Sequence, residues 1–255
     1  MIDLLPPDIP ALSAAIMIVS SFFTSLIMAA TGFGGGVLLL SIMASLMPIA
    51  ALIPVHGVVQ LGSNTGRVFL LRQSVQWGYL LPFLAGSIIG AAVGGKMVVT
   101  LSDTVLRTGL ALFILYMVWG PKPKFIAAGA RWMVVAGGAF STFLTMFFGA
   151  TGPFVLAIFS NIFPDNRLHF IATHSSAMVI QHVLKVLAFG LLGFAFAPWA
   201  GLIVAMIATG FAGTWTGTRL LHRIPEAQFR IVFKLLITAV AAHLLWQGLS
   251  RGDWI

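Results

Sequence analysis

Polar side chains recur with the same spacing in the two halves of an otherwise apolar chain. His56 and Asn64 are eight residues apart, and so are His174 and His182. Eight residues make slightly more than two turns of a helix, so both members of each pair can face one cavity. Imidazole and amide groups can donate hydrogen bonds without carrying a negative charge. We therefore expect these four side chains to line one polar site.

The acidic residues lie elsewhere, at the chain ends or between apolar segments: Asp3, Asp8, Asp103, Asp165, Glu226 and Asp253. Cations and metals prefer carboxylate or thiolate ligands, and the chain has no cysteine. The polar groups inside the apolar segments are neutral or cationic: His56, Gln60, Asn64, Arg67, His174, Ser175, Ser176, Gln181, His182 and Lys185. This pattern favours an anion site, and no metal or other cofactor is expected. Arg67 and Lys185 either carry charge in the pathway or extend to a membrane interface.

Two clusters of helix-breaking residues add a second kind of donor. The first reads Thr31-Gly32-Phe33-Gly34-Gly35-Gly36, and the second reads Gly149-Ala150-Thr151-Gly152-Pro153. A helix that starts after Gly36 or after Pro153 would present free N–H groups and the positive end of its dipole, which bind anions. We therefore add a group of backbone and hydroxyl donors to the candidate binding residues: Gly34, Gly35, Gly36, Thr151, Gly152 and Ser175.

The elements that position these residues are membrane helices. The chain has 255 residues, of which 59% are hydrophobic and 8% charged, and its mean hydropathy is +1.04. Charged residues this sparse cannot cover a water-facing surface. About eight apolar segments predict an all-α, multi-pass integral membrane protein: 11–47, 50–71, 75–99, 104–119, 131–163, 168–192, 196–220 and 228–249. The first is expected to be retained, because no basic residue precedes it as in a signal peptide.

The net charge of +8 does not indicate nucleic-acid binding. Basic residues lie between the apolar segments, as in the cytoplasmic loops of membrane proteins.

Segments 11–47 and 131–163 are too long for single spans. At ~1.5 Å per residue, a continuous helix over 11–47 would reach ~55 Å, while the hydrocarbon core is about 30 Å thick. The glycine clusters lie in the middle of both segments. Each long segment is therefore expected to be a broken helix or a hairpin.

The two halves are predicted to be internal repeats, residues 1–120 and 121–255. At an offset of 118, His56, Asn64 and Arg67 match His174, His182 and Lys185. At an offset of 123, Gly94, Lys96, Asp103 and Arg107 match Gly217, Arg219, Glu226 and Arg230. Each repeat would contain one broken segment followed by three membrane helices, an organisation common in secondary transporters.

The distribution of basic residues favours inverted repeats. If each broken segment crosses once, the 14 basic residues divide evenly between the two sides. If each segment enters, turns at its glycines and returns, ten share one side and Lys96, Arg107, Lys185 and Arg251 share the other. The ten are Arg67, Arg72, Lys122, Lys124, Arg131, Arg167, Arg219, Arg223, Arg230 and Lys234. We prefer the hairpin topology, with both termini outside, and the single crossing stays open.

Four features occur together in this chain: the glycine run 31–36, the apolar helix after it, the sequence Val55-His56-Gly57 and the two-fold repeat. In this combination the chain resembles the sulfite exporter TauE/SafE family of membrane transporters over almost its whole length. The resemblance implies a bacterial inner-membrane carrier for sulfite, sulfoacetate or related organosulfur or organic anions. The chain departs from the pattern in its second break, which lacks a triple glycine.

The expected function is secondary transport of a small anion, with export of sulfite, an organosulfonate or an organic acid across the bacterial inner membrane. The alternatives are a passive anion channel, a cation or metal permease, and a membrane-embedded enzyme. No catalytic residue is expected, because Ser175 and His174 are adjacent and point to different faces of a helix. The expected partners are the anion and the lipid bilayer. Proton coupling through histidine, whose ordinary pKa is about 6.5, and a homo-oligomer both stay open.

Overall fold

A computed structural model describes residue 6 and residues 9–31, 34–98, 101–121, 130–220 and 226–251. These residues form helices and no strand, as the apolar segments predicted. The first five are α1 (Ala11–Thr31), α2 (Gly35–Leu46), α3 (Ile49–Leu71), α4 (Trp77–Val98) and α5 (Asp103–Trp119). The second five are α6 (Arg131–Phe148), α7 (Gly152–Ile162), α8 (Arg167–Leu191), α9 (Ala200–Leu220) and α10 (Glu226–Arg251). Short 3-10 turns, η1 (Arg72–Ser74) and η2 (Ala197–Trp199), precede α4 and α9.

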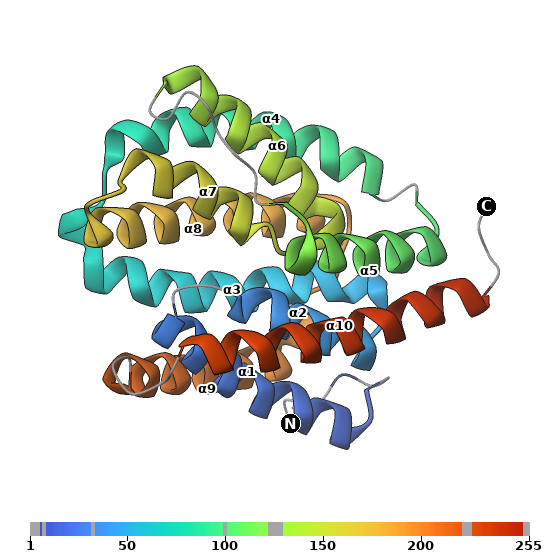
Figure 1. Ribbon diagram of the computed structural model, residues 1–255. Coiled ribbons are helices and arrows are strands. Elements are labelled where there is room, and N and C mark those ends of the chain that lie inside the picture. The colour runs from blue at the N-terminus through green and yellow to red at the C-terminus, as the bar shows by residue number, and fades with distance from the viewer. Residues whose placement is uncertain are drawn as a thin grey trace.

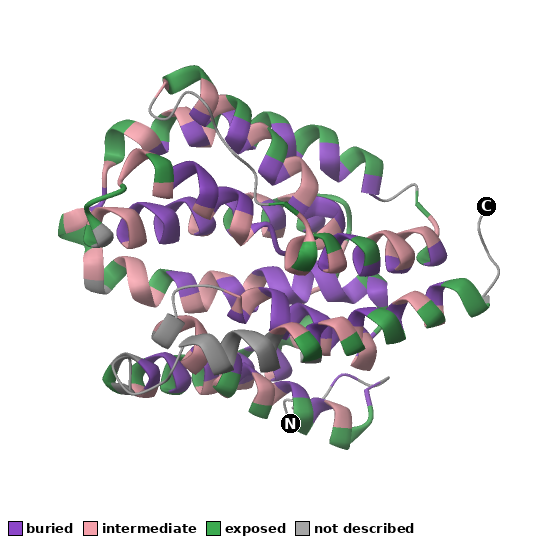
Figure 2. Cartoon of the chain, in the orientation of Figure 1, coloured by how far each residue is buried: buried purple, intermediate pink, exposed green. Residues whose placement is uncertain are grey.

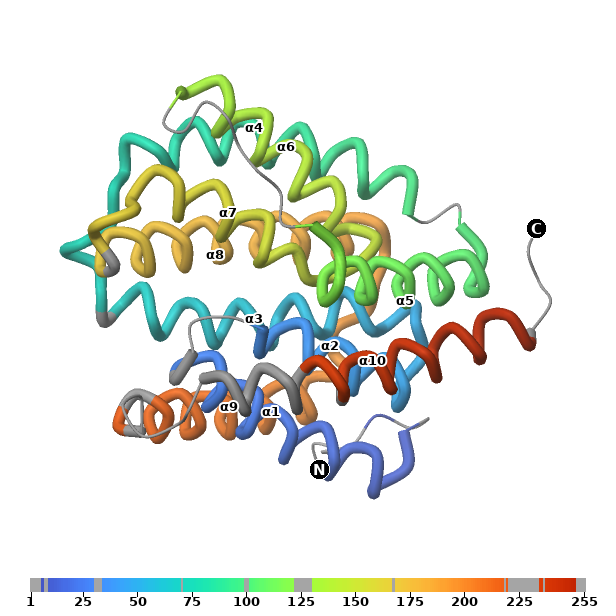
Figure 3. Tube along the Cα trace, viewed as in Figure 1, coloured from blue at the N-terminus to red at the C-terminus, as the bar shows by residue number. Residues whose placement is uncertain are grey.

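Both long apolar segments are broken at their glycines, as predicted. α1 packs against α2, and α6 packs against α7, so each segment folds back on itself. At ~1.5 Å per residue α2 and α7 are only ~16–18 Å long, about half the thickness of a bilayer core. Figure 3 shows that the two short helices leave the middle of the bundle toward opposite ends.

The short helices begin slightly earlier than expected, at Gly35 and Gly152. Gly34, the N-cap residue, has a φ of 85° in the left-handed region that glycine adopts without strain, so α2 can start at the next residue. Pro153 sits in the first turn of α7, where no intrahelical N–H is needed. Gly35, Gly36 and Gly152 therefore lie within the first helical turn, while Gly34 and Gly149 precede it.

The remaining helices pair across the two halves of the chain (Figure 1). α1 packs with α9, α4 with α6, α3 with α8 and α5 with α10, so each pair takes one helix from either half. α3 and α8 lie in the middle and run antiparallel (Figure 1). We refer to the two ends of the bundle as the Ile49 end and the Leu71 end, after the first and last residues of α3.

Glycines permit two of these helix pairs to approach closely. On α4, Gly86, Gly90 and Gly94 face the backbone of α6. On α9, Gly213 and Gly217 face the backbone of α1. Small residues at such crossings are typical of helix packing in membranes, where backbones approach without an intervening side chain.

The outer surface of the bundle is apolar. Figure 2 shows buried residues concentrated on α2, α3 and α8 and exposed ones on the outer helices. Among the exposed side chains are Leu12, Ile16, Val19 and Phe23 on α1, Ile88, Ile89 and Val93 on α4, and Val204, Phe211 and Trp215 on α9. An apolar surface of this extent is covered by lipid in a membrane protein. Within the described residues, four helical stretches are long and apolar enough to cross a bilayer: Ala11–Ala29, Trp77–Val98, Arg131–Phe148 and Ala197–Gly217.

Candidate functional site

A cavity lies where the two helix breaks meet the central helices. Its volume is about 40 Å³, enough for a few water molecules at roughly 10–15 Å³ each. Seven of its lining residues are predicted binding residues: Gly34, Gly36, His56, Asn64, Gly152, His174 and His182. The others are Gln60 and a mainly apolar set: Met28, Val37, Ala150, Pro153, Leu156 and Met178. Residues far apart in the sequence, from both halves, thus surround one small space.

The N-termini of α2 and α7 both open on this cavity. Their N-cap residues, Gly34 and Thr151, make no side-chain capping hydrogen bond. The first N–H groups of a helix have no intrahelical partner and carry the positive end of the helix dipole. Both helices are long enough, at 12 and 11 residues, for this field to be established. The cavity is therefore positive without needing a charged side chain.

His56 and His174 hold these two short helices by matching contacts. The Nε2 of His56 lies 3.0 Å from the carbonyl oxygen of Gly36, in the first turn of α2. The Nε2 of His174 lies 3.3 Å from the carbonyl oxygen of Gly152, in the first turn of α7. A carbonyl can only accept, so each Nε2 carries the proton and donates it. Both imidazoles therefore position a helix N-terminus in addition to lining the cavity.

Among the described residues, two histidine nitrogens are buried without a hydrogen-bond partner. They are the Nδ1 atoms of His56 and His182. The two rings meet edge to face across α3 and α8, with centroids 6.4 Å apart. Buried polar atoms are normally paired, by protein or by an occupant. Because His56 donates through its Nε2, its Nδ1 can only accept a hydrogen bond, whereas the Nδ1 of His182 can serve in either role.

A ladder of hydrogen bonds along α3 orients the amide groups. Arg67 donates to the Oδ1 of Asn64 at 2.9 Å, and the Nδ2 of Asn64 donates to the carbonyl of Gln60 at 2.8 Å. The Nε2 of Gln60 lies 3.2 Å from the Nε2 of His56, but because that nitrogen already donates to Gly36, the Gln60 amide contacts the ring without donating to it. Asn64, expected as a free donor, is thus already engaged by its neighbours. Arg67, half-buried, continues this polar stripe toward the Leu71 end.

Three predicted binding residues do not line the cavity. Gly35 faces the backbone of Thr24 on α1. The Thr151 hydroxyl donates to the Oε1 of Gln181 at 3.2 Å, and Ser175 is buried without a hydrogen-bond partner. Ser175 follows His174 directly, and adjacent helical residues point about 100° apart. These three residues therefore lie behind the walls of the cavity instead of facing it.

Gln181 organises the second break, although the binding-site prediction left it out. Its Nε2 donates to Ser141 at 2.8 Å and to Thr142 at 3.0 Å, both on α6, while its Oε1 accepts from Thr151. The residue therefore joins α8 to both sides of the α6–α7 break. Gln60 and Gln181 were both recognisable as deep polar groups, but only Gln60 lines the cavity.

Lys185 is fully buried and does not extend to an interface. Its side chain is 0% exposed, and its Nζ donates to the Gly149 carbonyl at 2.8 Å. Gly149 caps the C-terminus of α6 with a φ of 70°. A cation near a helix C-terminus is stabilised by the last carbonyls and by the negative end of the dipole. The alternative of an interfacial Lys185 is therefore wrong.

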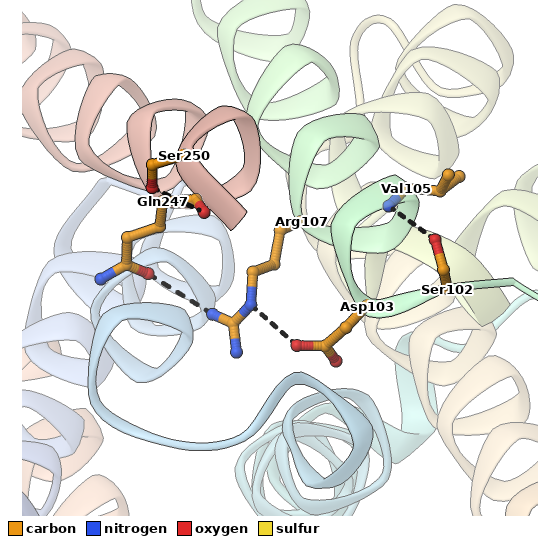
Figure 4. A network of polar contacts seen from close by, with 6 residues as sticks. All are labelled: Ser102, Asp103, Val105, Arg107, Gln247 and Ser250. Carbon is orange, nitrogen blue, oxygen red and sulfur yellow. Dashed lines mark hydrogen bonds and ion pairs between the residues drawn. The ribbon is translucent and has the colours of Figure 1, made fainter. Parts of the chain in front are cut away.

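A second polar cluster lies at the Ile49 end of the bundle (Figure 4). Arg107 pairs with Asp103 at 3.1 Å and donates to the Oε1 of Gln247 at 3.4 Å. The cavity beside it is larger, about 350 Å³, and is lined partly by the α2–α3 corner. Its arginine is already paired with a carboxylate and it contains neither helix break. The central cavity is accordingly the stronger candidate for a transport site.

No group of three or more His, Cys, Asp or Glu side chains that could hold a metal ion occurs within the described residues.

A family model described as "Sulfite exporter TauE/SafE" matches residues 17–244, which is nearly the whole chain. No curated protein and no solved structure matches the sequence.

Proposed function

The chain belongs to the sulfite exporter TauE/SafE family of multi-pass membrane transporters, and from this premise we propose that it exports a small anion across the bacterial inner membrane. The substrate class we propose is sulfite, an organosulfonate or a related small organic acid. The mechanism we propose is secondary transport, with the central cavity as the substrate site.

The observation that carries this proposal is the chemistry of the cavity. Its polar lining consists of imidazole, amide and backbone groups, and two helix N-termini open on it. No carboxylate is among the lining residues. An anion loses its hydration when it enters a low-dielectric site, and hydrogen-bond donors must replace it. The free N–H groups at the starts of α2 and α7, the Gln60 amide and His182 can donate to an anion, and the lining holds no carboxylate or thiolate that would attract a metal cation.

The size of the cavity supports a compact substrate. A volume of about 40 Å³ admits an ion of a few heavy atoms. Apolar side chains, including Val37, Leu156 and Met178, form part of the wall. Such a wall can contact the carbon of a short sulfonate or organic acid while the donors hold its oxygens.

Transport by purified protein in proteoliposomes tests the substrate class. We expect saturable, protein-dependent uptake of sulfite and short sulfonates, stimulated by the same anion on the opposite side. Exchange of this kind is expected of a carrier and not of a passive channel. Accumulation of Ni²⁺ or Co²⁺ without anion uptake would show that the cavity serves a cation permease. Empty vesicles and the Gly193→Ala variant, altered far from the cavity, serve as controls.

We further propose that residues 1–120 and 121–255 are inverted repeats. The cross-half pairing of helices, the matched contacts of His56 and His174, and the antiparallel α3 and α8 support this arrangement. The basic residues support the orientation. Arg72 directly follows Leu71, and Arg131 begins α6, which starts toward the same end of the bundle (Figure 1); we assign this Leu71 end to the cytoplasm by the positive-inside rule.

Cysteine labelling of the naturally cysteine-free chain tests this topology. Gln73 follows α3, Asp165 precedes α8 and Ala195 precedes α9, and all three are exposed. We expect Gln73→Cys and Asp165→Cys to react with a membrane-impermeant maleimide only from the cytoplasm, and Ala195→Cys only from outside. If each broken segment crossed the membrane once, positions 73 and 165 would react from opposite sides.

A further inference from the structure

The Lys185 ammonium is the only lysine charge that the described helices enclose completely, and the proposed site does not itself require it. It lies among α8, α3 and the α6–α7 break. Within the described residues, its hydrogen-bond partner is the Gly149 carbonyl. A carbonyl satisfies one of the three ammonium donors and supplies only a partial negative charge. The remaining charge needs compensation from another source.

No carboxylate among the described side chains compensates the charge of Lys185. Of the acidic side chains that the structure describes, Asp103 pairs with Arg107 at the Ile49 end, and Asp165 is exposed in the turn before α8. No salt bridge involving Lys185 occurs among the described residues. A buried cation without a counter-ion is unfavourable, and the penalty is removed when an anion comes close.

The cavity places such an anion within reach of Lys185. His182, one turn earlier on α8, lines the cavity, and so do His56 on α3 and Ala150 next to Gly149. Gly57 leaves room for the lysine, because a Cβ at that position would lie 2.9 Å from its Cε. Lys185 is therefore directly behind the cavity wall. At this depth the low dielectric makes its charge effective without contact.

We propose that Lys185 is the counter-charge of the transported anion and sets the net charge that the site selects. This inference rests on the proposed function, because it requires an anion in the central cavity. The transported anion takes the place that a carboxylate would have in a structural ion pair. Lys185 acts as a positioning and specificity-determining residue, since His56 and His182 stand between it and the substrate.

Two neutral variants separate the charge of Lys185 from its hydrogen bond. Lys185→Gln has an amide N–H that can still donate to Gly149, whereas Lys185→Met has no donor, and Lys185→Arg retains the charge. The probes are methanesulfonate and sulfate, whose charges of −1 and −2 do not change near neutral pH. Each competes with labelled sulfite for transport in proteoliposomes, and the ratio of the two inhibition constants is compared among variants.

We expect Lys185→Gln and Lys185→Met to weaken sulfate competition relative to methanesulfonate by about tenfold. The lost positive charge attracts a dianion twice as strongly as a monoanion at the same distance. Lys185→Arg should keep the wild-type ratio. A wild-type ratio in Lys185→Gln, with loss only in Lys185→Met, would reduce Lys185 to a structural cap of α6 and overturn the proposal.

Protein stability provides a readout that does not depend on transport. Removing a buried charge that has no counter-ion also removes its desolvation penalty. Lys185→Gln, which can still donate to the Gly149 carbonyl, should therefore melt at or above the wild-type temperature in detergent, and a marked drop would contradict an uncompensated charge. If wild type transports no anion, the proposed function fails. If wild type transports anions and the neutral variants keep their charge preference, only the role of Lys185 fails.

Discussion

Replacing Gly149 with alanine should lower the transport rate about tenfold or more while the protein still inserts into the membrane. Gly149 has a φ of 70°, a conformation that costs other residues roughly 1–2 kcal/mol. A Cβ there would also lie 2.9 Å from the Cδ1 of Leu40 on α2. The Leu40 methyl can turn away from that Cβ, but the backbone strain is relieved only by shifting the α6–α7 break. That shift moves the carbonyl that Lys185 holds and the neighbouring Ala150 in the cavity wall.

Gly193→Ala is the matched control. Gly193 has a φ of 92° in the turn between α8 and α9, and nothing lies within 4 Å of its would-be Cβ. Its backbone penalty is therefore similar, but the strain falls outside the cavity. Initial rates in proteoliposomes, normalised to reconstituted protein, should separate the two variants even where their melting temperatures agree. Equal rates would mean that the geometry of the second break does not matter for transport.

The helix breaks could be predicted because their signals are local. Glycine and proline interrupt a helix wherever they cluster, and the length of segments 11–47 and 131–163 required an interruption. Periodicity likewise identified the polar face of the helix containing His56 and Asn64. The start of each short helix was misplaced by about two residues, because the left-handed conformation of Gly34 cannot be distinguished in sequence from ordinary glycine flexibility.

The contacts between distant segments could not be predicted from one sequence. Lys185 was assigned either to the pathway or to an interface because it is near the end of its apolar segment. What fixes it inside is the Gly149 carbonyl, 36 residues away, together with the absence of a side chain at Gly57. Met28 in the cavity wall gave no signal at all, because a methionine on an apolar helix usually packs against lipid or core.

Removing the His174 imidazole should reduce transport by about ten- to a hundredfold. In His174→Ala the Gly152 carbonyl loses the Nε2 donor at 3.3 Å, a hydrogen bond that contributes roughly 0.5–1.5 kcal/mol to holding the start of α7. The first turn of α7 is then free to shift, and the donors that face the anion shift with it. His174→Gln should recover most of the rate, because its amide N–H can replace the imidazole donor. His243→Ala, on exposed α10, is the control and should transport normally.

The same variants decide whether histidine carries protons during transport. His56 and His174 each donate a hydrogen bond to a backbone carbonyl. A neutral imidazole has the one N–H that this bond needs. We therefore expect the flux of a strong-acid sulfonate, whose charge is fixed, to stay flat from about pH 5.5 to about pH 8.5, a range that brackets the ordinary histidine pKa of about 6.5. The His56→Gln and His174→Gln variants should show the same flat profile. A wild-type flux that changes through this range, together with flat profiles in both glutamine variants, would instead assign proton coupling to these histidines and contradict a purely positioning role.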